Sequence, residues 1–137
     1  MRRTATITLH WLSLMALVLL VAGGPVPVLA WAFGLTGLGL CAIAAARGLK
    51  NGPGPKLTGA LRVAHPWLSR AMYAALAATA AATLWHVAVG PVAGLQRLHF
   101  YLMSAASLHA IFHLWRHTAL GDGALRRITP TSMHGVL

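Results

Sequence analysis

The sequence predicts an all-α protein: a transmembrane, up-down bundle of four helices with both termini on the cytoplasmic side. Three observations lead to this fold class. Of the 137 residues, 58% are hydrophobic and only 9% are charged, which is too apolar a composition for a soluble domain of this size. Four apolar stretches each approach the roughly 20 residues that a helix needs to cross a bilayer. The connections between neighbouring spans are short, and short connections make neighbouring helices antiparallel.

The four predicted spans cover residues 4–21, 28–46, 66–89 and 94–120. The first resembles a signal peptide, but it lacks a convincing cleavage site and further spans follow, so we expect a retained helix. A polar loop rich in Gly and Pro lies at residues 49–61, because these residues stop helices and favour turns. We expect a short tail, residues 124–137, at the membrane interface, and a single domain over residues 1–137.

The basic residues are distributed very unevenly. The chain carries 11 Lys and Arg residues against one acidic residue, a net charge of +10. All of them except Arg97 lie near one end of the predicted bundle. This end holds the start of the chain, the loop at residues 49–61 and the end of the fourth span. The positive-inside rule therefore places this end in the cytoplasm, in a multi-pass protein of a bacterial inner membrane. Because the basic residues flank apolar spans and form no continuous stripe, the expected partner is the lipid bilayer and not nucleic acid.

Several of the eight histidines fall inside the apolar stretches. Intramembrane histidines usually mark a functional site, and neutral imidazole is a common axial ligand of haem iron. His10 lies seven residues after Arg3, and His109 lies seven residues before Arg116. With a rise of about 1.5 Å per residue, both lie roughly 10 Å inside the cytoplasmic interface. One histidine from each of two facing helices at equal depth is what a bis-histidine haem requires.

A second pair of histidines shares another depth. His86 and His99 lie near the outer ends of the third and fourth spans, and they are candidates for the ligands of a second haem. Near the cytoplasmic position, Arg62 and Arg70 are candidates for contacts with haem propionates, since Arg suits bidentate carboxylate contacts. The alternative is that these two arginines only set the orientation of the chain.

His109, His113 and His117 follow one another at intervals of four residues, so they share one helical face. Such a ladder can bind a transition metal, as in a metal transporter or a hydrolase. We favour the alternative that one of the three ligates and the others pack or hydrogen-bond. The only carboxylate side chain, Asp122, lies beyond the helix end, which excludes an HExxH site. The single cysteine, Cys41, excludes an internal disulfide framework.

Three segments resemble one known family: ITLHWLSLMALVLL, LRVAHPWLSRAMYAAL and LHAIFHLWRHTALGDGALRRITP. They are similar to the first, third and last helices of the bacterial cytochrome b561 family, which are membrane b-type cytochromes of four helices. The resemblance implies that His10 and His109 take the positions of haem ligands in the first and last helices. It also implies single-electron transport, with quinone or a redox protein as partner.

The chain departs from this family in its second helix. Family members typically bind two haems, and the outer haem takes a histidine at the start of helix two. The segment LAWAFGLTGLGLCAIAAARG has no histidine, and Trp31 or Phe33 stands in that region. In the family, the two haem-ligating histidines of the last helix are fourteen residues apart. In this chain that spacing separates His99 from His113, so His113 is an alternative to His109 as a ligand. The equal depth of His10 and His109 favours His109. We therefore expect one haem b, with two as the alternative.

These observations predict a membrane-bound b-type cytochrome of the respiratory chain, which exchanges electrons with quinone or forms part of a larger oxidoreductase. Whether it is itself an enzyme is left open. The alternative is a non-catalytic membrane anchor or structural subunit of the same fold, with one haem or none.

Overall fold

The computed structural model describes residues 2–49 and 52–136. Lys50 and Asn51, which belong to the predicted polar loop, lie outside the described residues, as do Met1 and Leu137. Within this range the chain is all-helical and has no strand. Its elements are α1 (Arg2–Gly23), α2 (Pro27–Arg47), α3 (Gly59–Ala88), α4 (Leu95–Thr118) and two short 3₁₀ helices, η1 (Ala124–Arg127) and η2 (Thr131–Met133).

The helices follow the predicted spans closely, with one difference at the start of α3. This helix begins at Gly59 and continues through Pro66, where the sequence predicted its first residue. Proline removes one backbone N–H from the helix ladder and crowds the carbonyl one turn earlier, so it normally marks a helix start. Here the turn on either side of Pro66 is held by His65, which is buried against α4 and hydrogen-bonded to Arg116.

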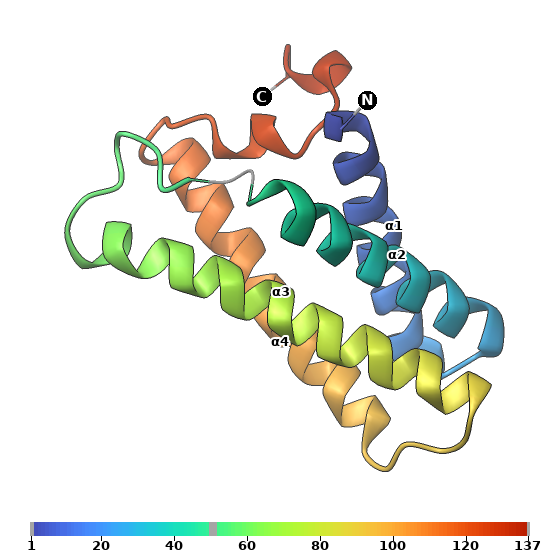
Figure 1. The fold of residues 1–137 in the computed structure, drawn as a ribbon. Helices are drawn as coiled ribbons and strands as arrows, with labels where there is room; N and C mark the ends of the chain where they lie inside the picture. The colour runs from blue at the N-terminus through green and yellow to red at the C-terminus, as the bar shows by residue number, and fades with distance from the viewer. Residues whose placement is uncertain (1, 50–51, 137) are drawn as a thin grey trace.

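The two chain ends and the loop between α2 and α3 lie at one end of the assembly, and the two short loops lie at the other (Figure 1). Helix α2 packs extensively against both α1 and α3, whereas α4 contacts α1 and α3 over smaller areas. The core between them is apolar and includes Leu17, Leu20, Phe33 and Leu102. Close approach of α2 to α3 requires Gly34, because a Cβ there would overlap the side chain of Leu84.

Three helices, α1, α2 and α3, are long and apolar enough to cross a membrane. Helix α4 has 24 residues but is not among these three, since histidines and serines interrupt its apolar sequence. Large apolar side chains are exposed on the outside of all four helices, among them Val28, Trp67, Leu108 and Ile111. An exposed apolar surface of this extent marks contact with a membrane or a protein partner.

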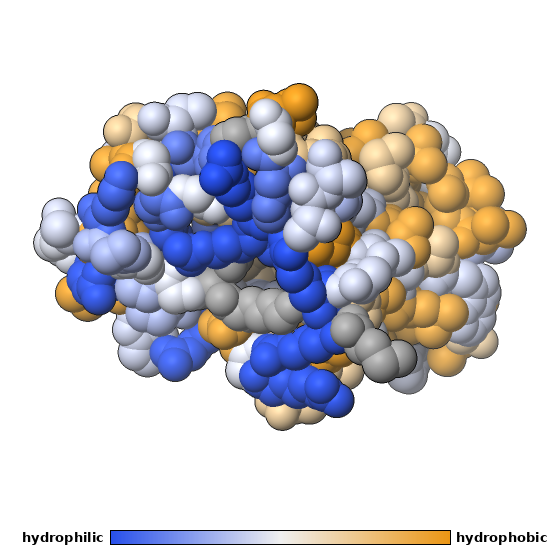
Figure 2. Space-filling view, turned by 90° about the horizontal axis from the view of Figure 1, so that it is seen from above, coloured by the Kyte–Doolittle hydropathy of each residue, from blue (hydrophilic) through white to orange (hydrophobic). Residues whose placement is uncertain are grey.

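The end that holds the chain termini is here named the basic end; it comprises the start of α1, residues 52–58 and residues 119–136. Figure 2 looks down on it and shows hydrophilic residues gathered there, with hydrophobic residues towards the side. The tail is attached to α1: Arg3 Nη2 donates to the carbonyl oxygens of Arg126 (3.0 Å) and Thr129 (3.1 Å), and Trp11 Nε1 donates to that of Ile128 (3.0 Å).

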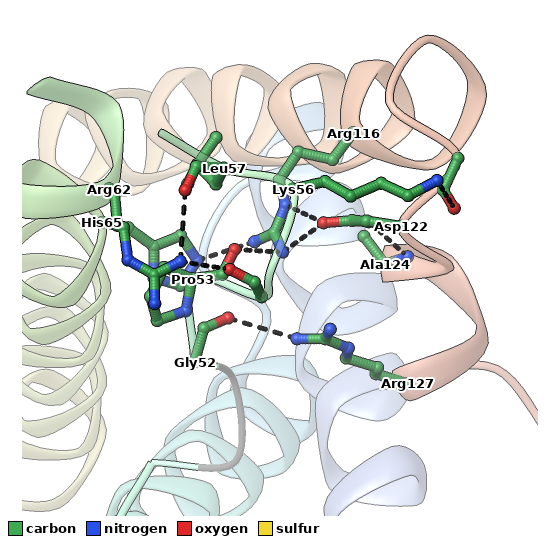
Figure 3. Close-up of polar contacts among 12 residues, drawn as sticks. Gly52, Pro53, Lys56, Leu57, Arg62, His65, Arg116, Asp122, Ala124 and Arg127 are labelled. Carbon is green, nitrogen blue, oxygen red and sulfur yellow. Dashed lines mark hydrogen bonds and ion pairs between the residues drawn. The ribbon is translucent and has the colours of Figure 1, made fainter. Parts of the chain in front are cut away.

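A fully buried arginine at the end of α4 organises this region (Figure 3). The Arg116 guanidinium forms an ion pair with Asp122, and its Nε donates to Asp122 Oδ2 at 2.7 Å. Its Nη1 donates to Nε2 of His65 at 2.9 Å, and its Nη2 donates to the carbonyl of Pro53 at 2.9 Å. Asp122 Oδ1 accepts from the backbone N–H of Ala124 at 2.9 Å. One side chain thus joins α3, α4, the loop and the start of η1.

Three more basic side chains fasten the same loop through backbone carbonyls. Arg62 Nη1 donates to the carbonyl of Gly54 at 2.6 Å, and Arg127 Nη1 donates to that of Gly52 at 3.1 Å (Figure 3). From the loop itself, Lys56 Nζ donates to the carbonyl of Gly121 at 3.1 Å. The loop between α2 and α3 is therefore held on the end of α4.

We predict that Asp122→Asn strongly destabilises the fold. The substitution leaves the buried Arg116 guanidinium without a countercharge, and breaking a buried pair in this way costs about 3–5 kcal/mol. Unfolding of the detergent-solubilised protein, followed by circular dichroism, measures the loss. The matched control is Arg126→Gln, which changes an exposed charge at the same end and should shift stability by less than about 0.5 kcal/mol. Equal unfolding curves for Asp122→Asn and the unsubstituted protein would contradict the role given to this pair.

Candidate functional site

Four histidines from three helices gather in the half of the assembly next to the basic end. They are His10 of α1, His65 of α3, and His109 and His113 of α4; we name them the histidine cluster. His10 lies close enough to His109 for the two imidazoles to interact electrostatically. The ring centroids of His109 and His113 are 4.4 Å apart, and those of His113 and His65 are 6.2 Å apart. His10 and His109, which the depth count had matched, thus lie in the same half of the assembly, and their role as a ligand pair stays a prediction.

The members of the cluster differ in how their ring nitrogens are engaged. His10 and His109 are partly buried. The ring of His10 contacts Trp11, and the ring of His109 contacts His113. Within residues 2–49 and 52–136, neither ring makes a hydrogen bond. Their nitrogens are therefore available to a ligand. His113 is more deeply buried and lies edge-on to both His109 and His65.

His65 is held in one protonation state by its partner. Arginine only donates hydrogen bonds, so Nε2 of His65 accepts from Arg116 and its ring hydrogen lies on Nδ1. This Nδ1–H is buried and has no partner among the residues described. A buried donor without an acceptor is costly, so His65 keeps a hydrogen-bond donor that no described residue uses. The sequence reveals no sign of this arrangement, because His65 and Arg116 come from distant parts of the chain.

The second predicted pair is engaged differently. Thr83 has one hydroxyl hydrogen, which it donates to the carbonyl of Thr79 at 2.7 Å. Its oxygen therefore accepts from Nε2 of the fully buried His99, at 2.8 Å. His86 accepts on Nδ1 from the backbone N–H of Val92, at 3.1 Å. In both rings the hydrogen then lies on Nε2, so neither presents an Nε2 lone pair to iron.

Phe33 completes the surroundings of His99. Its ring lies edge-on to the imidazole, with centroids 5.6 Å apart and an angle of 89° between the planes. Phe33 is itself fully buried and stands in the region where the second helix lacks a histidine. In this arrangement the hydrogen bonds of His86 and His99 and the position of Phe33 do not suit a second bis-histidine haem. The second haem was an alternative predicted from the sequence, and it stays a prediction.

The two arginines proposed as propionate contacts are engaged with other groups. Arg62 is occupied by loop carbonyls, as described above. Arg70 lies over the ring of Trp67, at 5.2 Å from its centroid, and lines a cavity on the side of α3 that faces α2. The third alternative, a metal bound by the His109, His113 and His117 ladder, finds no support: no three His, Cys, Asp or Glu side chains in the described part of the chain are placed to hold a metal ion.

Comparison with protein-family models, with curated proteins and with solved structures finds no match to this chain. The resemblance to the cytochrome b561 family therefore stays a prediction from the sequence. The fold defines an all-helical protein with at least three helices able to cross a membrane, and the function has to be inferred from the histidine cluster.

Proposed function

We propose that the protein is a membrane-bound b-type cytochrome in which His10 and His109 are the axial ligands of one haem b. The observation that carries this proposal is that these two imidazoles, from α1 and α4, lie near enough to interact electrostatically and make no hydrogen bond through their ring nitrogens in the described structure. A bis-histidine haem needs two imidazoles and no carboxylate. That requirement suits a chain whose only carboxylate is already paired with Arg116.

The surroundings of the two ligands suit a flat, apolar cofactor. Helix α4 packs less extensively against α1 and α3 than α2 packs against its neighbours, and a cofactor between α1 and α4 would add contacts where the helices make few. Bound haem supplies a reversible one-electron couple between ferric and ferrous iron. Of the chain's own residues, the helices would hold the two imidazoles, and partial burial of both rings would limit the access of water to the haem. His113, edge-on to His109, is the alternative ligand.

The proposal includes a location and partners. The protein lies in the bacterial inner membrane with α4 as its fourth span and with the basic end in the cytoplasm, as the positive-inside rule requires. It exchanges electrons with quinone, or with a redox partner in a larger oxidoreductase of the respiratory chain. The alternative is a non-catalytic membrane anchor. The hydrogen bond of His99 to Thr83 and its ring contact with Phe33 favour this alternative, because the half of the assembly that holds His99 then has no pair of histidines free to bind haem iron.

We predict that the purified protein shows sharp b-type bands in a dithionite-reduced minus oxidised spectrum, with one haem per chain as pyridine haemochrome. His10→Ala and His109→Ala each remove an axial ligand and should abolish the bands. His99→Ala and His134→Ala are the matched controls and should keep one haem per chain.

Two outcomes would change the proposed function. Loss of the bands in His113→Ala, with bands intact in His109→Ala, would make His113 the ligand and contradict the depth count. A colourless unsubstituted protein would reject the cytochrome and favour the membrane anchor.

We predict that both termini face the cytoplasm. In a Cys41→Ala background, a cysteine at Ser132 in the tail and one at Pro91 in the α3–α4 loop report the two ends, because both positions are exposed. A membrane-impermeant maleimide should label the Pro91→Cys protein in intact spheroplasts and the Ser132→Cys protein only after permeabilisation. The reverse pattern would contradict the orientation derived from the basic residues.

A further inference from the structure

Nearly all positive charge in this protein lacks an acidic partner within the chain. There are 11 Lys and Arg residues and one acidic residue, Asp122. Asp122 is paired with Arg116, and both side chains are fully buried. Backbone carbonyls accept hydrogen bonds from several of the remaining cations, but they do not neutralise them. Acidic side chains of this chain therefore leave most of the positive charge at the basic end uncompensated, and anions from outside can meet it.

A cavity of about 620 Å³ opens beside one of these cations. It lies between the last two turns of α2, the α3 helix and the loop that joins them. Its walls are mainly apolar, and they include Ala44, Gly48 and Pro66, with Arg70 and Tyr73 as polar side chains. A volume of this size lies within the range of about 300–1,000 Å³ that ligand pockets occupy.

The cavity lies at the level of the lipid headgroups. Helix α2 has 21 residues, which is one bilayer crossing, and it ends at Arg47. Helix α3 has 30 residues, so its first ten or so project beyond a crossing of about 20 residues counted back from Ala88. This count places Arg70 at the boundary of the hydrocarbon. Trp67, which lies under the Arg70 guanidinium, belongs to the same interfacial level, where Trp is enriched.

A second cation borders the same region. A much smaller hollow shares Ala44, Gly48 and Tyr73 with the cavity and is also lined by Arg2. Nη2 of Arg2 donates to the carbonyls at the end of α2, at 2.8 Å to Arg47 and 2.7 Å to Gly48. These bonds cover carbonyls that would otherwise repel an anion. Nε of Arg2 is buried and has no partner in the part of the chain described.

We propose that this cavity binds the phosphate headgroup of an anionic phospholipid. Arg70 supplies the principal positive charge, Tyr73 supplies a hydrogen-bond donor, and the acyl chains lie along the exposed apolar surfaces of α2 and α3. Basic pockets between membrane helices on the cytoplasmic side bind lipid headgroups in this way. A neutral ligand would leave the Arg70 charge uncompensated. This inference does not depend on haem binding, since no member of the histidine cluster lines the cavity.

The test uses the full chain purified in a neutral detergent. Native mass spectrometry measures binding of phosphatidylglycerol and of phosphatidylcholine with identical acyl chains, and phosphatidylglycerol should bind more tightly. Arg70→Gln should weaken phosphatidylglycerol binding about fivefold, the effect of one Arg at an anionic surface. Arg126→Gln, which removes an exposed charge of the same end outside the cavity, should leave it unchanged. Ala44→Phe, which fills the cavity without changing charge, should also weaken binding.

Several results would overturn the inference. Equal loss in Arg70→Gln and Arg126→Gln would mean diffuse attraction without a site. Equal binding of the two lipids would exclude recognition of charge, and displacement by millimolar inorganic phosphate would point to a soluble anion. Loss of haem bands in Arg70→Gln would assign Arg70 to a propionate and leave the cytochrome proposal standing. A colourless protein that still selects phosphatidylglycerol through Arg70 would reject the cytochrome and support the lipid site.

Discussion

The buried ion pair between Arg116 and Asp122 is the interaction on which the rest of the structure depends. It joins four segments of the chain, and it fixes the depth of α4 against α3 through His65. His113 lies one helical turn before Arg116, and His109 lies two turns before it. Any change in the position of Arg116 would therefore move both histidines along the helix axis. The pair thus sets the depth of His109 relative to His10, on which the proposed haem site depends.

Because this pair uses the chain's only carboxylate, the other basic side chains need acceptors of another kind. Several use backbone carbonyls, and such carbonyls are available only where the backbone leaves a helix. Residues 52–58 provide them, and Gly54 shows how closely the loop fits: its φ is +73°, and a Cβ there would lie 2.9 Å from Nη2 of Arg116. Arg70 makes no hydrogen bond to a carbonyl among the described residues, and in our proposal a lipid phosphate meets its charge. The same uneven charge predicts the orientation of the chain in the membrane.

The sequence was informative where the signal is local and periodic, and much less so where it depends on pairs that are distant in the chain. Composition and apolar stretches predicted four helices, which the structure confirms. Counting from charged flanks predicted that His10 and His109 share a depth, and the two rings lie near enough to interact electrostatically. The extension of α3 before Pro66 was not predictable, because the contacts that hold it come from α4. For the same reason the hydrogen bond between Thr83 and His99 had no sequence signal. The role of His10 and His109 as haem ligands is still a prediction.

The two halves of the assembly differ in how their histidines are engaged, and this difference bears on the direction of electron flow. In the outer half, His99 is bound to Thr83 and closed in by Phe33, and His86 accepts from the adjoining loop. In the half next to the basic end, the rings of His10 and His109 make no hydrogen bond in the described structure. Under the proposed assignment, a single haem in this half would lie roughly 10 Å from the cytoplasmic interface. Without a second cofactor beyond it, electrons would enter and leave on the same side, so the protein would connect redox partners along the membrane and would not carry electrons across it.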